Sequence, residues 1–403
     1  MHHSKTLALW LLLLIVFFDW LGVGLVYPMF SSMLFQPECP FLACGTSNAE
    51  RGFYLGVLLA AMSTAQFFSG PILGTLSDQL GRRPIFLYSL VLGVIAYMCC
   101  VGAVWMESLG GLILSRVLVG IGAGKPVSAA IADISSDSSS KAKNFGLYSM
   151  ASGVGFTIGP YLGGKFSGSG FYLPFCIAAV ASLVNFLLIW AFFQETNHEL
   201  KKQTLRWSAG LRNLKKAFTI PGLRSVYLAT FLYCFGWSFY FEFLPVTWIS
   251  DFHFDAQQIG FFYAYGAAWY AISSGYLIRP FVSYFRSETI FFYALSAIGV
   301  LLLSMYFGRT VLWIWLAFPV ANFLASLLFP TSTTMVSNWA GKDAQGETLG
   351  ILQSVQAAAF AFSPLASGAL LGDSPHMPMI LGGGTMLLGA LVVGVFLRKK
   401  VFS

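Results

Sequence analysis

Charged residues are scarce in this chain. Only 10% of its 403 residues are Asp, Glu, Lys or Arg, whereas a soluble domain carries about 25%. A soluble fold of this length needs far more charge to cover its surface, so the composition excludes a water-soluble protein. Apolar residues make up 57% of the chain. We therefore expect a protein that crosses a membrane many times.

Histidine and cysteine are also rare, with five and six residues. The histidines lie at the termini or in predicted loops, and no His or Cys spacing is typical of a metal site. No nucleophile and base form a recognisable set, so we expect neither an enzyme nor a metal or cofactor. Cys39 and Cys44 share an outer loop and form a candidate short disulfide in an oxidising compartment.

The apolar residues form long continuous runs, such as Leu7–Phe18. A transmembrane β-barrel would need apolar and polar residues in alternation, so we interpret the runs as helices of about 20 to 25 residues. The predicted fold class is an all-α polytopic membrane protein. Its twelve predicted spans are 7–34, 52–76, 84–105, 108–134, 144–166, 171–193, 223–250, 257–278, 288–307, 311–338, 345–371 and 377–397.

The net charge of +7 is distributed unevenly over the predicted loops. With both termini in the cytoplasm, 18 of the 23 Lys and Arg residues lie on the cytoplasmic side and 3 on the outer side. The other two, Arg116 and Lys125, fall within a span. This bias follows the positive-inside rule. The basic excess therefore orients the chain in a membrane and does not indicate binding of nucleic acid.

The chain divides into two related halves. The polar, basic segment 194–222 separates six spans from six, which predicts bundles at 1–193 and 223–403 joined by a cytoplasmic linker. Four residues of the first half recur 204 positions later in the second half: Pro126, Gly146, Pro160 and Gly164 match Pro330, Gly350, Pro364 and Gly368. Repeated six-helix halves are typical of transporters that bind substrate between the halves near the midplane.

Several motifs resemble those of one superfamily. The loop Gly74–Pro84 (GTLSDQLGRRP) resembles the signature loop of the major facilitator superfamily, and Arg116–Gly124 (RVLVGIGAG) resembles its second motif. Gly146–Gly164 resembles the antiporter motif, and Asp19–Pro28 (DWLGVGLVYP) resembles the first-helix motif of drug–proton antiporters. The resemblance implies twelve transmembrane helices in two pseudo-symmetric six-helix bundles.

Within that superfamily, the amino-terminal half is most similar to the tetracycline exporters. Ile131–Gly146 and Phe192–Thr196 carry this similarity. Two positions depart from it, because those exporters have an Asp in the third span, where this chain has Ala96, and another in the ninth span, where it has only Glu288 at the edge. These departures argue against tetracycline itself as the substrate.

Charged residues inside the predicted spans are candidate functional groups, because burying a charge in hydrocarbon costs at least about 2.5 to 3.5 kcal/mol. Asp19, Arg116 and Glu242 are candidates for proton coupling, a role that the resemblance implies for Arg116. Lys125 is nine residues after Arg116, so on a regular helix the two side chains point to opposite faces. Lys125 either binds an anion in the cavity, or extends to the cytoplasmic interface or to Asp133.

The other candidates belong to gating and to substrate binding. We expect the signature loop and the glycine-rich fifth span to govern closure of one side, through Asp78, Gly81, Arg82, Arg83, Gly155, Gly159 and Pro160. Aromatic walls with sparse polar groups suit an amphipathic ligand. The predicted substrate-binding residues are Lys125, Trp237, Tyr240, Tyr263, Trp269, Asn322, Gln353 and Gln356.

We expect a secondary active transporter that exports a small amphipathic compound in exchange for protons by alternating access. Its partners are then the substrate, protons and the bilayer of a bacterial inner membrane, and the resemblance implies a monomer. One alternative is the same fold carrying an anionic metabolite or a siderophore-like metal chelate, by import or export, which Lys125 and Arg116 favour. A second alternative is a membrane sensor or scaffold that transports nothing.

Overall fold

The computed structural model describes residues 2–36, 39–43, 45–135, 138–197, 200, 208–220, 222–308, 310–340, 345–372 and 374–401. Every regular element within these ranges is a helix, in agreement with the predicted all-α fold. The helices form two compact units, with residues 1–44, 61–207 and 254–264 in unit 1 and residues 45–60, 208–253 and 265–403 in unit 2. Cys44 lies outside the described residues, so the disulfide with Cys39 stays a prediction.

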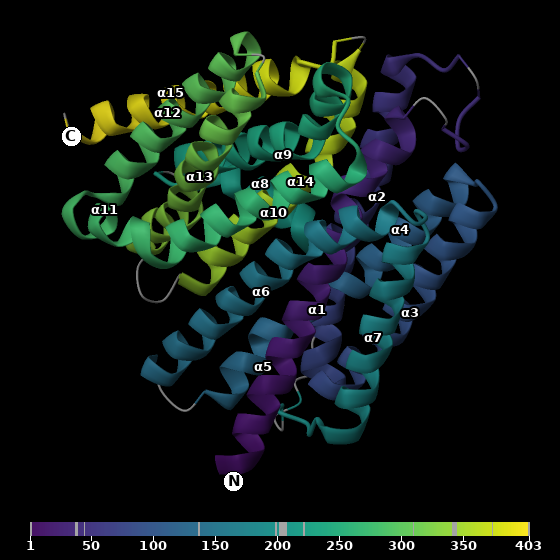
Figure 1. The fold of residues 1–403 in the computed structure, drawn as a ribbon. Helices are drawn as coiled ribbons and strands as arrows, with labels where there is room; N and C mark the ends of the chain where they lie inside the picture. The colour runs from purple at the N-terminus through teal and green to yellow at the C-terminus, as the bar shows by residue number, and fades with distance from the viewer. Residues whose placement is uncertain are drawn as a thin grey trace. The chain divides into compact units, whose positions relative to one another are not determined.

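Unit 1 holds most helices of the amino-terminal half (Figure 1). They are α1 (His2–Phe35), α2 (Asn48–Leu80) from residue 61 onward, α3 (Arg82–Trp105), α4 (Leu109–Ala123), α5 (Val127–Ile134), α6 (Ser138–Ser167) and α7 (Leu173–Phe192). The first residues of α10 (Ala256–Ile272) also belong to this unit. Part of its core joins α1, α3, α5 and α7 through the buried side chains of Leu12, Phe86, Ile131 and Ile189.

Unit 2 holds the start of α2 and the helices of the carboxyl-terminal half. These are α8 (Ala209–Thr219), α9 (Arg224–Phe252), the rest of α10, the π-helix η1 (Ser273–Leu277), α11 (Ile278–Tyr284), α12 (Ser287–Phe307), α13 (Val311–Trp339), α14 (Gln345–Leu371) and α15 (Met377–Val401). Large aromatic side chains such as Trp248, Phe291 and Phe318 are fully buried in its core.

The linker between the predicted bundles contains the short helix α8. Lys216 of α8 forms an ion pair with Glu347, and the Asn213 amide donates a hydrogen bond to Ser354 Oγ at 3.0 Å. Both partners belong to α14, so α8 is attached to a helix of unit 2.

Nine helical segments of the described residues are long and apolar enough to cross a membrane. They coincide with nine of the twelve predicted spans. The fifth, seventh and eighth predicted spans correspond to α6, to α9 and to the succession of α10, η1 and α11. These three are helical but rich in Gly, Ser, Tyr and Trp, which are less apolar than Leu or Ile. The twelve-helix prediction is consistent with this arrangement.

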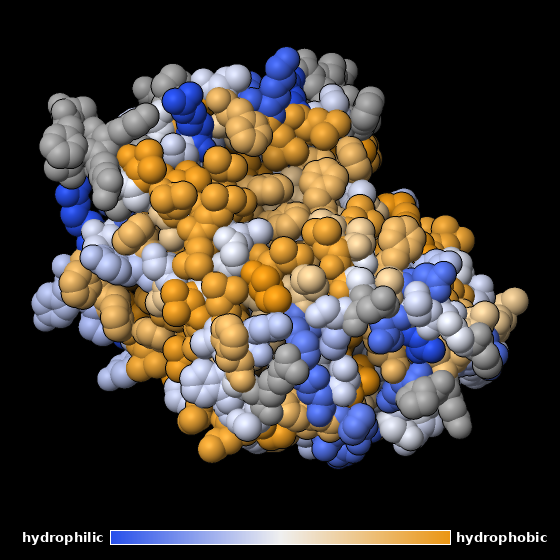
Figure 2. Space-filling model, turned by 90° about the horizontal axis from the view of Figure 1, so that it is seen from above, coloured by the Kyte–Doolittle hydropathy of each residue, from blue (hydrophilic) through white to orange (hydrophobic). Residues whose placement is uncertain are grey.

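The surface also suits a lipid environment. Figure 2 shows broad areas of hydrophobic side chains interrupted by hydrophilic patches. Large apolar side chains such as Trp105, Trp190 and Phe307 are more than half exposed. Monomeric soluble proteins rarely expose contiguous apolar patches of more than a few hundred Å², so these surfaces are consistent with helices that face hydrocarbon.

Two predicted spans are interrupted helices. The fourth span breaks at residues 124–126, between α4 and α5. Pro126 explains the break, because proline lacks a backbone N–H and its ring obstructs the preceding helical turn. The eighth span changes from α10 to the π-helix η1 before α11 begins. Single π-helical turns inside α-helices occur frequently at functional sites.

Glycines let α6 approach α1 closely in unit 1. A Cβ atom added at Gly155 would lie 2.4 Å from the Phe17 carbonyl oxygen, and one at Gly159 would lie 2.7 Å from that of Leu21. Such close backbone approach is typical of small residues at helix interfaces in membranes. The two predicted gating glycines therefore contact α1, beside which α6 runs in Figure 1.

A second type of glycine contact occurs twice, once in each unit. In unit 1, a Cβ at Gly260 would lie 2.3 Å from the Pro160 carbonyl oxygen and 3.0 Å from Gly164 Cα. In unit 2, a Cβ at Gly56 would lie 2.3 Å from the carbonyl oxygen of Pro364 and 3.0 Å from the Cα of Gly368. Corresponding residues are 204 positions apart. The structure thus extends the predicted repeat from sequence positions to a pair of equivalent helix contacts.

We predict that Gly56→Ala and Gly260→Ala each lower the apparent melting temperature of the detergent-solubilised protein. Alanine is favoured over glycine in a helix by about 1 kcal/mol, but overpacking a close contact costs about 1 to 3 kcal/mol. Gly102→Ala is the matched control, because a Cβ there meets nothing within 4 Å. Equal melting temperatures for the three variants would contradict the close contacts.

Candidate functional site

The centre of unit 1 contains a close ion pair. Lys125 Nζ lies 2.7 Å from Asp19 Oδ1. Asp19 is in the middle of α1, whereas Lys125 lies in the break between α4 and α5. The Lys125 side chain is only 7% exposed and that of Asp19 is 36% exposed. The lysine side chain is therefore enclosed by protein, while the Asp19 side chain is partly exposed.

The helix break positions Lys125 for this pairing. A Cβ at the preceding Gly124 would lie 2.8 Å from Gly70 Cα on α2, so the chain passes close to α2 at the break. The Val127 N–H then donates to the Lys125 carbonyl oxygen at 2.9 Å, which makes a tight turn before α5. We expected Lys125 to bind an anion, or to extend to the cytoplasmic interface or to Asp133. In the structure its partner is Asp19 instead.

Arg116 has different surroundings. It is 4% exposed, and its Nη2 lies 2.8 Å from the sulfur of Met62. Its guanidinium carbon lies 5.2 Å from the centre of the Phe30 ring, a cation–π contact. Within the part of the chain that the structure describes, Nε and Nη1 have no hydrogen-bond partner and no carboxylate forms an ion pair with Arg116.

A second charged cluster lies at the ends of α2, α3 and α5. Arg82 forms ion pairs with Asp78 at 2.7 Å and with Asp133 at 2.9 Å, and it also donates to Ser77. The Arg83 guanidinium donates to the Trp190 carbonyl oxygen at 2.7 Å. The predicted gating residues Asp78, Arg82 and Arg83 thus connect four helices of unit 1.

Glu195 stabilises the start of α3. Its two carboxylate oxygens accept hydrogen bonds from the backbone N–H groups of Arg82 at 2.7 Å and Arg83 at 3.0 Å. The first N–H groups of a helix lack partners within the helix and attract negative charge. Gly81, with φ 99°, leaves room for this carboxylate, because a Cβ there would lie 2.5 Å from Glu195 Oε2.

The predicted acidic and aromatic residues of the second half are mostly enclosed. Glu242 of α9 is 6% exposed, and Tyr240 and Tyr263 are fully buried. The Tyr240 hydroxyl donates to the sulfur of Met305, and the Asn322 amide donates to the Phe318 carbonyl oxygen at 2.9 Å. These side chains are packed inside unit 2, and their role in substrate binding stays a prediction.

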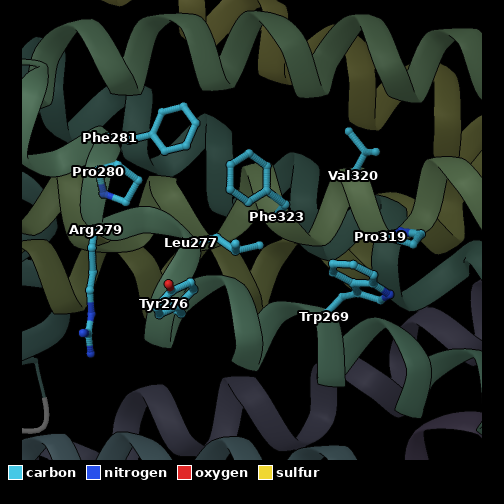
Figure 3. Close-up of a pocket in the computed structure, with 9 residues that line it drawn as sticks. All are labelled: Trp269, Tyr276, Leu277, Arg279, Pro280, Phe281, Pro319, Val320 and Phe323. Atoms are coloured by element: carbon cyan, nitrogen blue, oxygen red, sulfur yellow. The ribbon is translucent and has the colours of Figure 1, made fainter.

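A cavity of about 610 Å³ lies between α10, η1, α11 and α13 of unit 2 (Figure 3). Of the predicted substrate-binding residues, Trp269 lines it. The other walls are mainly aromatic and apolar, and Arg279 is the charged residue at the cavity: the lining is Trp269, Tyr276, Leu277, Arg279, Pro280, Phe281, Pro319, Val320 and Phe323.

Sequence reasoning missed several of these residues. Glu195 was part of the similarity to the tetracycline exporters, but no pattern predicted that it binds the start of α3. Met62 and Phe30 lie in ordinary apolar runs, and nothing in the sequence connects them with Arg116. The signal that was available for Lys125 was Pro126, which indicates a helix break.

Comparisons with known proteins agree on one family. Residues 9–323 match the family model of the Major Facilitator Superfamily. The chain is 29% identical to the tetracycline resistance protein, class C, of Escherichia coli over 389 residues, which cover 91% of this chain and 90% of that protein. It is 28% identical to the quinolone resistance protein NorA of Staphylococcus aureus over 394 residues, which cover 94% and 93% of the two chains.

Solved transporter structures share the fold. The human organic anion transporter MFSD10 (TETRAN) has a TM-score of 0.69 at 21% identity, covering 96% of this chain and 99% of that chain. The D-xylose–proton symporter has a TM-score of 0.71 at 16% identity, covering 94% and 96%. These likenesses confirm the predicted fold class and, at such identities, concern the fold alone.

We predict that Glu195→Ala lowers the apparent stability by about 1 to 2 kcal/mol, because it removes both acceptors at the start of α3. Glu195→Gln keeps one oxygen acceptor and is expected to cost less. Thermal unfolding in detergent measures the effect. Glu107→Ala is the control, since Glu107 is exposed in a turn. A loss no larger than that of the control would show that Glu195 does not stabilise the helix.

Proposed function

Because the chain belongs to the major facilitator superfamily and is a membrane transporter rather than an enzyme, we propose that it exports small amphipathic compounds in exchange for protons. Two of its relatives are named for resistance to tetracycline and to quinolones, which supports export of drug-like compounds. Ala96, which replaces an Asp of the tetracycline exporters, argues against tetracycline as the compound.

The Asp19–Lys125 pair is the observation that carries this proposal. An ionised carboxylate in a membrane-spanning bundle needs a cation near it, and Lys125 supplies one at 2.7 Å. A proton on Asp19 removes the negative charge and releases Lys125. A positively charged substrate competes for the same carboxylate, whose side chain is 36% exposed.

Competition at one carboxylate provides the coupling. A proton and a cationic group cannot both occupy Asp19, so each is carried in the absence of the other. This mutual exclusion is what exchange requires, whereas simultaneous binding would produce co-transport. Between the two, Lys125 neutralises Asp19, so the carboxylate is not left as an isolated charge.

The remaining predicted residues have supporting roles in this proposal. Alternating access exposes Asp19 first to one side of the membrane and then to the other. The Asp78–Arg82–Asp133 cluster stabilises one arrangement of the cytoplasmic ends of unit 1, and the contacts of Gly155, Gly159 and Pro160 allow α6 to pack closely. Arg116 and Glu242 contribute to proton coupling, because their charges affect how readily nearby groups take up or release a proton. The protein works as a monomer in the inner membrane of a bacterium, with both termini in the cytoplasm.

We predict that Asp19→Asn abolishes compound-dependent proton movement. Everted membrane vesicles with a respiration-driven, acid-inside pH gradient are loaded with a pH-sensitive dye. Cationic amphiphiles and anionic chelates are added in turn. One compound class should collapse the gradient with the wild-type protein, and the same compounds should have no effect with Asp19→Asn, because the asparagine amide does not take up a proton at neutral pH.

Two further variants sharpen this test. Lys125→Gln should retain some proton movement but shift its dependence on pH, because Asp19 loses its cation partner. Glu107→Gln, which removes an exposed carboxylate, should behave as wild type. If no compound affects tight vesicles, or if Asp19→Asn behaves as wild type, proton exchange at Asp19 is excluded. Retained cellular function in a double variant, Asp19→Asn with Arg116→Gln, would point instead to a sensor or scaffold.

A further inference from the structure

The inner part of unit 1 holds more positive than negative charge. Among the described residues, Asp19 of α1 and Arg116 of α4 are charged side chains of its membrane-spanning helices, and Lys125 lies in the break between α4 and α5. Lys125 neutralises Asp19, and no described carboxylate is paired with Arg116. One buried positive charge therefore remains without an anion.

The immediate neighbours of Arg116 do not neutralise it. A thioether sulfur is a weak acceptor, and a phenyl ring offers only its quadrupole. The atoms Nε and Nη1 are buried without a hydrogen-bond partner, and a buried charged donor without one is costly. A guanidinium presents a planar fork that fits a carboxylate with two parallel hydrogen bonds. A carboxylate therefore has the charge and the hydrogen-bond acceptors that Arg116 lacks.

We propose that Arg116 binds the carboxylate of the transported compound, and that the substrate class is a zwitterionic amphiphile with an ammonium group at its other end. This inference rests on the proposed exchange function and specifies its substrate. The ammonium group binds Asp19 in place of Lys125 or a proton.

Electrostatics favours a zwitterion over a simple anion. A proton on Asp19 makes unit 1 more positive, so an anion at Arg116 would bind more tightly when the proton is present. When each of the two ligands binds more tightly in the presence of the other, the anion and the proton are transported together. An ammonium group that competes with the proton for Asp19 restores exchange. The carboxylate end then supplies recognition and the ammonium end supplies coupling.

A flexible side chain contacts the proposed carboxylate site. The Met62 sulfur touches Arg116 at 2.8 Å, and Met62 is itself partly exposed. Methionine is unbranched and adapts its shape readily, so it can move aside without rearrangement of the helices. The Phe30 ring, which is 1% exposed, stays packed against the guanidinium.

The experiment uses three compounds that share one aromatic scaffold. The first carries both a carboxylate and an amine, the second is its methyl ester, and the third is its N-acyl derivative. Initial rates of gradient collapse in the everted vesicles give KM for each. On the wild-type protein, the zwitterion should have a KM at least about tenfold lower than that of the ester, which is the scale of a lost charged hydrogen bond. The N-acyl derivative should cause no collapse.

Variants of Arg116 test whether the difference in KM between the zwitterion and the ester depends on this residue. Arg116→Gln should abolish the difference in KM between the zwitterion and the ester. Arg116→Lys keeps the charge but loses the fork, so an intermediate KM is expected. Lys143→Gln, which removes an exposed cation, is the control. Equal KM values for zwitterion and ester on the wild-type protein would overturn the proposal, and this comparison needs no variant.

A binding measurement separates this inference from the proposed function. The purified protein should be stabilised against heat more by the zwitterion than by the ester, and Arg116→Gln should remove that difference. If the difference is present but no compound collapses the gradient, the carboxylate site stands and proton exchange fails. If the gradient collapses equally with zwitterion and ester and Arg116→Gln alters both alike, exchange stands and the carboxylate site is wrong.

Discussion

An ionised side chain that the fold encloses needs a partner, and three polar arrangements of unit 1 follow from this constraint. Asp19 has Lys125, Arg82 has Asp78 and Asp133, and the Glu195 carboxylate has the backbone N–H groups at the start of α3. Each arrangement joins segments far apart in the sequence. The charges therefore act as specific connections between helices, in a protein whose apolar contacts offer little directional preference.

The membrane spans and the internal repeat were predictable, because each produces a regular pattern in the sequence. Apolar runs give the spans, since a helix must cross about 30 Å of hydrocarbon. The 204-residue offset gives the repeat, and the structure shows its physical basis at Gly56 and Gly260, which each face a proline carbonyl on another helix. Glycine is required wherever two backbones meet, so the same spacing persists in both halves.

Pairwise contacts were less accessible to sequence reasoning. A regular helix places Arg116 and Lys125 on opposite faces, but the break at Pro126 leaves Lys125 outside any helix and beside Asp19. The partners of Arg116, Met62 and Phe30, are apolar residues among many of the same type. The π-helix η1 and the cavity beside it arise from tertiary packing, which no local propensity encodes.

The interruption between α4 and α5 has a mechanical consequence. Within α4, backbone hydrogen bonds fix the position of Arg116 along the helix axis. Three non-helical residues follow, and Lys125 is the middle one. The spacing between the two cations therefore depends on the turn at 124–126 and can change by small backbone rotations. A change at this turn also moves Lys125 relative to Asp19, so the strength of their ion pair depends on the backbone as well as on the two side chains.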